Sequence, residues 1–212
     1  MTTIYIGSSN VERFADIIEK ETRNSLVVHK CTHLNGFVTR MESLKETDRR
    51  IIISVIENFL CDEVNGSVTK GDIEKAIEKS LTAFTKVVGE TATRLPTTKF
   101  AVIEPIERPA IGWFTSGLKD ITMEYSKLIN GLSLTNVMII KKVDLPVQTF
   151  DEQKIHLTPA SGKKFVEATI FYAGNFFEAV VVDLASSEVP MDVAGDANNI
   201  KYQVKPENVS LI

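Results

Sequence analysis

The stretch RRIIISVI, at residues 49–56, decides the fold class of this chain. Its β-branched run predicts a strand, and such continuous apolar runs are typical of parallel strands that helices cover on both faces. Four more apolar stretches are predicted as strands, at residues 2–7, 25–31, 99–106 and 136–145. Residues 49–56 are thus the third of five expected strands.

Amphipathic segments alternate with these strands. The clearest is residues 70–88, whose apolar side chains at Ile73, Ile77, Leu81 and Phe84 share one helical face. Further helices are predicted at residues 8–21, 38–47 and 109–129 and after Pro159. This alternation predicts an α/β protein: three layers, doubly wound, around a five-stranded, mainly parallel, flavodoxin-like sheet.

The predicted domain covers residues 1–182, followed by a C-terminal extension at 183–212 that we expect to be loop or partly disordered. With 43% hydrophobic and 25% charged residues, the composition is that of a soluble globular protein. No apolar run reaches the roughly 20 residues that span a bilayer, and no signal peptide is visible, so we expect a cytoplasmic or nuclear protein. The net charge of −4 argues against a nucleic-acid-binding face. Cys31 and Cys61 lack metal-motif spacing and are expected to be reduced.

In a doubly wound sheet, ligands bind beyond the carboxyl ends of the strands. Four residues stand there: Ser9 after the first strand, Gly36 after the second, Asn58 after the third and His156 before the last helix. Each has an ordinary interpretation when taken alone, as a helix cap, a turn, a loop contact and a structural histidine. Their joint order is what indicates an active site.

This order of Ser, Gly, Asn and His resembles the SGNH (GDSL-like) hydrolase family. The corresponding blocks are IYIGSSN at residues 4–10, HLNGFVT at 33–39, ISVIENF at 53–59 and DEQKIHLTPASG at 151–162. The stretch IEPIERPAIGW at residues 103–113 also resembles the segment that these enzymes carry after their fourth strand. The resemblance covers residues 3 to 180, nearly all of the chain except the tail.

The resemblance implies a serine esterase acting on small acyl or acetyl esters, without a metal or an organic cofactor. Ser9 would be the nucleophile and His156 the general base. The backbone N–H groups of Ser9 and Gly36 and the side-chain amide of Asn58 would form the oxyanion hole.

Three blocks depart from the family pattern. In the first, Ser8 replaces the acidic residue of GDS, whose side chain is not part of the proton relay, and in the third, Phe59 follows Asn58 where the family has aspartate. The family places an aspartate three residues before the histidine, where this chain has Gln153. Three explanations stay open: an insertion brings Asp151 or Glu152 to His156, Gln153 or a backbone carbonyl orients the ring, or the site is a relic. In the third block IEN replaces GxN, and Glu57 is expected to crowd the mouth of the site or to alter its charge.

Two other functions compete with the esterase. One is an inactive domain of the same fold that serves as an interaction module, with a protein partner or as a homodimer. The other is a nucleotide-binding flavodoxin-like protein, although the first loop lacks a phosphate-binding glycine pattern. Four aromatic residues fall in the loops around the expected site, where they either line it or pack locally: Phe37, Phe59, Trp113 and Phe114.

Overall fold

The computed structural model describes residues 2–8, 11, 13–14, 26–65, 69–154 and 156–178, all of which lie in one compact unit, Met1–Ala179. Ser9 and most of the helix predicted at residues 8–21 are therefore outside the described residues. The same holds for the predicted domain boundary after residue 182 and for the tail, which stay predictions.

A five-stranded parallel sheet forms the centre of the described fold. Its strands are β1 Thr3–Gly7, β2 Leu26–Lys30, β3 Arg50–Ser54, β4 Lys99–Ile103 and β5 Val137–Ile140, in the order β2-β1-β3-β4-β5. In the central register, Tyr5 of β1 lies between Val28 and Ile52. The order steps outward in both directions from β1, which is the doubly wound arrangement that the sequence predicts. The predicted fold class is confirmed.

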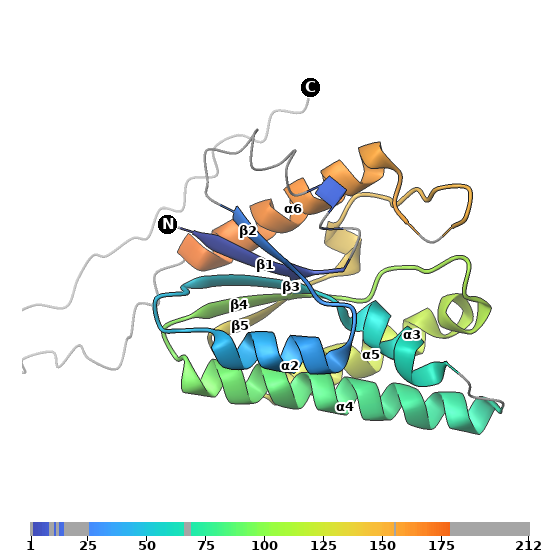
Figure 1. Cartoon of the computed structure of the whole chain (residues 1–212), viewed down its shortest axis with the longest axis horizontal. Helices are drawn as coiled ribbons and strands as arrows, with labels where there is room; N and C mark the ends of the chain where they lie inside the picture. The colour runs from blue at the N-terminus through green and yellow to red at the C-terminus, as the bar shows by residue number, and fades with distance from the viewer. Residues whose placement is uncertain are drawn as a thin grey trace, which may run out of the picture. The chain divides into compact units, whose positions relative to one another are not determined.

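Helices cover both faces of this sheet (Figure 1). The helices α2 Leu34–Ser43, α4 Lys70–Arg94 and α5 Gly112–Gly131 lie on one side, and α6 Pro159–Glu178 lies on the other. A short helix, α3 Ile56–Val64, follows β3 at once, and a 3₁₀ turn, η1 Lys142–Asp144, follows β5. None of the described helices is both long and apolar enough to cross a membrane.

Two separate apolar cores follow from these layers. The larger one packs Phe37, Phe84, Phe100 and Tyr125 between the sheet and the helices α2, α3, α4 and α5. The other core packs β1 against α6 and against the helical residues Val11 and Phe14. The sequence predicts Val11 and Phe14 on one helical face, and both are buried.

Two glycines place the segment after β1. A Cβ atom on Gly7 would lie 2.6 Å from Cβ of Val11, and one on Gly162 would lie 1.9 Å from Cε2 of Phe14. Both contacts are far shorter than a side chain allows, so only glycine fits at either position. Phe14 therefore packs directly against Gly162 in the first turn of α6, the helix that follows the loop carrying His156.

Candidate active site

His156 lies in a short hairpin loop before α6. Phe150 and Leu157 form an antiparallel bridge. On either side of it, the N–H of Asp151 donates to the carbonyl of His156 at 2.8 Å, and the N–H of Thr158 donates to the carbonyl of Thr149 at 2.9 Å. The turn closes with the N–H of Lys154 donating to the carbonyl of Asp151 at 2.9 Å. Lys154 has φ of 56°, the left-handed conformation found in such hairpin loops.

This hairpin brings the side chain of Asp151 to His156. Oδ2 of Asp151 is 3.3 Å from Nδ1 of His156, and Oδ1 accepts the backbone N–H of His156 at 3.4 Å. The pairing of the two hairpin arms explains why the acid stands five residues before the histidine and not three, because Asp151 lies directly opposite His156 across a four-residue turn. Asp151 is thus the acid that the structure places beside His156.

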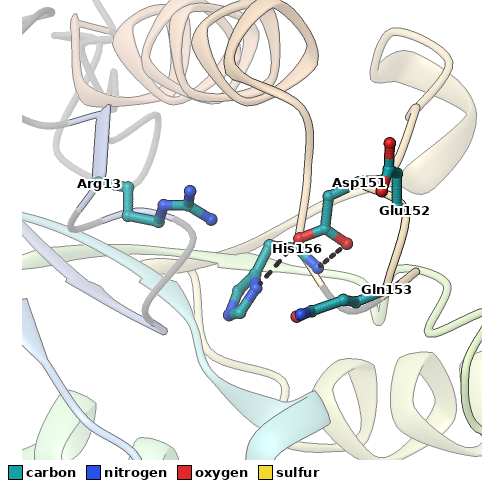
Figure 2. Close-up of a pocket in the computed structure, with 5 residues that line it drawn as sticks. All are labelled: Arg13, Asp151, Glu152, Gln153 and His156. Atoms are coloured by element: carbon teal, nitrogen blue, oxygen red, sulfur yellow. Dashed lines mark hydrogen bonds and ion pairs between the residues drawn. The ribbon is translucent and has the colours of Figure 1, made fainter.

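The two alternatives to Asp151 lie differently. The side chains of Glu152 and Gln153 are exposed, and in Figure 2 the hydrogen bond and the ion pair drawn from His156 both run to Asp151. Asp151, Glu152, Gln153 and His156 all line a pocket of about 500 Å³. Arg13, from the segment after β1, extends toward this pocket from the other side (Figure 2).

Ser9 itself lies outside the described residues, but its neighbours define where its loop begins. The buried Ser8 donates its N–H to the carbonyl of Ser54 at the end of β3, at 3.2 Å. Val11 has helical backbone, and its N–H donates to the carbonyl of Ser8 at 3.0 Å. The loop therefore leaves β1 at the carboxyl edge of the sheet.

Gly36 is helical, which corrects its prediction as a loop residue. It is the third residue of α2, and the first intrahelical bond runs from the N–H of Phe37 to the carbonyl of His33 at 3.2 Å. The N–H of Gly36 therefore has no intrahelical acceptor, as is general for a first helical turn. A Cβ atom on Gly36 would meet nothing within 4 Å, so there is open space where a side chain would stand.

Asn58 is also helical, as the third residue of α3, and this corrects its placement in a loop. Its Oδ1 accepts a hydrogen bond from a terminal guanidinium nitrogen of Arg108 at 2.6 Å, and its Nδ2 reaches the carbonyl of Cys31 at 3.5 Å. The residues that follow Gly36 and Asn58 pack against each other, with the ring centroids of Phe37 and Phe59 5.5 Å apart.

Glu57 is turned into the protein, so the prediction that it crowds the mouth is wrong. Its side chain is 2% exposed, and its carboxylate accepts the N–H of Ile106 at 2.9 Å. Burial raises the pKa of Glu57, and the nearby charge of Arg108 opposes that rise. Glu57 therefore links α3 to the loop after β4 through a buried hydrogen bond.

Arg108 is the residue of this region that sequence reasoning missed. It is 8% exposed, although it stands in a loop, and its backbone carbonyl accepts the N–H of Ile111 at 2.8 Å. Nothing in the local pattern IERPAIG marks it as buried, because its partners are 50 residues away in the sequence.

The aromatic residues do not line the site. Phe37, Phe59 and Phe114 are at most 2% exposed and belong to the core on the α4 side. Trp113 lines a different pocket, between α4 and α5. Local packing is thus the correct alternative for all four. Both cysteines are free thiols, and the described residues hold no group of three or more side chains suited to a metal ion.

Solved structures with a similar fold include several esterases and lipases. A lipase from a goat rumen metagenome matches with a TM-score of 0.58 at 12% identity, over 82% of this chain and 97% of that one. An acetyl xylan esterase matches with a TM-score of 0.55 at 14% identity, over 82% and 99%. A Parabacteroides merdae protein described as a GDSL-like lipase matches with 0.55 at 11%, over 82% and 95%. No family model and no curated protein matches the sequence.

Proposed function

Starting from the fold that this chain shares with SGNH and GDSL-like esterases and lipases, we propose that it is a serine esterase that cleaves small acyl or acetyl esters. The observation that carries the proposal is the pairing of Asp151 with His156 at 3.3 Å, in a pocket that Arg13 also lines. A carboxylate opposite a half-exposed imidazole at the carboxyl edge of a parallel sheet is the arrangement that a general base needs.

In this reaction Asp151 fixes the state of His156. When Nδ1–H donates to Asp151, the lone pair of Nε2 is free to accept the proton of Ser9. Ser9 Oγ then forms a bond to the ester carbonyl carbon. His156 returns the proton to the leaving alcohol as the carbon–oxygen bond of the ester breaks. Water, deprotonated by the same histidine, releases the acid from the acyl-enzyme and regenerates Ser9.

The developing oxyanion needs donors that are oriented before the reaction. Gly36 supplies an N–H at the start of α2 that no helical carbonyl accepts. Asn58 supplies Nδ2, since its carbonyl oxygen is engaged by Arg108. The backbone N–H of Ser9 is the third donor of the proposed hole.

Hydrolysis of 4-nitrophenyl acetate and butyrate by the purified full chain tests this proposal, with Ser9→Ala and His156→Ala beside it. We expect both variants to lose at least about 10³-fold in kcat, because nucleophile and base act as a unit. Ser8→Ala is the matched control and retains turnover, since Ser8 is outside the proton relay. Absence of turnover in folded wild-type protein, or full activity in Ser9→Ala, would overturn the proposal and favour the inactive interaction module.

A further inference from the structure

We propose that Arg108 is a positioning residue that holds the side-chain amide of Asn58 in the orientation that stabilises the oxyanion. The inference rests on the proposed esterase function, because it assigns a task within that same site. Arg108 contacts no reacting atom and acts through Asn58.

The hydrogen bond between Arg108 and Asn58 fixes which way the oxygen and the nitrogen of the Asn58 amide point. A guanidinium carries only donors, so the atom of Asn58 that lies 2.6 Å from Arg108 must be the carbonyl oxygen. Nδ2 then points away from Arg108. Of its two hydrogens, one faces the carbonyl of Cys31 at a long 3.5 Å, and the other is left for a substrate oxygen.

The burial of Arg108 shows that this contact is held at a cost. Its Nε is buried and has no hydrogen-bond partner among the described residues. Buried charges and unpaired buried donors both destabilise a fold unless another group compensates them. Glu57 lies next to Asn58 on α3 and is 2% exposed, and the charge of Arg108 opposes the rise that burial causes in the pKa of Glu57. An arginine whose guanidinium only had to be hydrated would lie at the surface and not in this buried position.

The sequence departures in the third block have the same explanation. The position after Asn58, where the family block has aspartate, is Phe59, and its ring is buried in the core. Phe59 offers no polar group to the amide. Arg108 thus supplies, from the loop after β4, the polar partner for Asn58 that Phe59 does not offer.

The loop of Arg108 also connects the two halves of the site. The N–H of Ala110 donates to the carbonyl of Lys154 in the His156 hairpin at 3.2 Å. At the other end of the same loop, the N–H of Ile106 is held by Glu57 at 2.9 Å. The segment that orients Asn58 therefore spans from the oxyanion side to the side of the general base.

A double-mutant cycle on kcat tests the inference, with Arg108→Met, Asn58→Ala and the two combined. Loss of one oxyanion donor typically costs about 10²–10³ in kcat. We expect Arg108→Met alone to lower kcat about 10- to 100-fold with KM changed less than about threefold, and to have no further effect once Asn58 is alanine. Arg108→Lys, which keeps one donor, restores part of kcat.

A second pair of variants separates positioning from folding. Arg108→Met removes the positive charge that opposes the rise in the pKa of Glu57, so the double variant Glu57→Gln/Arg108→Met, which removes that carboxyl as well, is expected to recover the stability and not kcat. Equal losses from Arg108→Met with and without Asn58, or recovery of kcat in the Glu57→Gln double variant, would overturn the inference.

A readout without substrate keeps this test distinct from the failure of the proposed function. The side-chain ¹⁵N–¹H signals of Asn58, measured by NMR in the wild-type chain and in Arg108→Lys, report the amide directly. We expect them to shift, because the charge-assisted hydrogen bond to Oδ1 is altered. If folded wild-type protein hydrolyses no ester, the function fails while this shift still tests the contact; unchanged Asn58 signals would show that Arg108 does not hold the amide.

Discussion

The pairing of Asp151 with His156 is the part of the site that one substitution tests most sharply. Asp151→Asn keeps the shape of the side chain and removes its charge. It also presents an amide that can hold the ring in the wrong tautomer, with Nδ1 as acceptor and Nε2 carrying the proton. We therefore expect the general base to be lost while the hairpin keeps its backbone hydrogen bonds.

The size of the effect follows from the geometry. Two opposite charges 3.3 Å apart attract by about 5 kcal/mol at an effective dielectric constant of about 20, and by about 2.5 kcal/mol at about 40. The side chains of His156 and Asp151 are 31% and 32% exposed, so water screens the pair in part and about 2.5–4 kcal/mol applies. Since roughly 1.36 kcal/mol is tenfold in rate, kcat falls about 10²- to 10³-fold.

Steady-state hydrolysis of 4-nitrophenyl acetate by Asp151→Asn measures this loss, with thermal unfolding as the check on the fold. Glu152→Gln and Gln153→Ala are the matched controls, because both side chains line the same pocket and are exposed. We expect their kcat to stay within about threefold of wild type. The reasoning is refuted if Asp151→Asn is as active as wild type, or if Glu152→Gln loses as much.

Three further predictions concern stability, each measured by urea unfolding. Gly162→Ala places a Cβ atom 1.9 Å from the ring of Phe14 and is expected to lower the unfolding free energy by about 1–3 kcal/mol, whereas Gly174→Ala, with nothing within 4 Å, does not lower it. Gly36→Ala fills open space in a helix and is expected to raise it by up to about 1 kcal/mol; a loss would contradict the helical placement. The folded-state pKa of Glu57 lies above 4.5, so wild-type stability falls as pH rises from about 4.5 through that raised pKa. Glu57→Gln is expected to lack this fall, and parallel pH profiles would contradict it.

The sheet was predictable because its strands carry their own signal. The run at residues 49–56 is too continuously apolar for a surface element, and the structure places Arg50–Ser54 of it in the buried β3. The helix α3 was missed, although Ile56, Phe59, Leu60 and Val64 have helical spacing. It begins without any loop after β3, so the apolar residues at 55 and 56 merge with the strand pattern.

The site was predictable only in part, for physical reasons. The order of Gly36, Asn58 and His156 along the chain follows from strand ends, which the sequence marks. The partner of His156 depends on the turn that Lys154 makes at φ of 56°, and this turn decides whether the acid five or four residues ahead faces the ring. Arg108 joins the site through contacts with α3 that no local pattern encodes.

The central claim, that Ser9 is an activated nucleophile, is tested most directly by covalent labelling. The purified chain is treated with a fluorophosphonate probe, and the modified peptide is located by mass spectrometry, with Ser9→Ala and Ser8→Ala treated alike. We expect one adduct on Ser9 in the wild-type chain and in Ser8→Ala, and none in Ser9→Ala. A folded wild-type protein that forms no adduct, or an adduct that persists in Ser9→Ala, would contradict it.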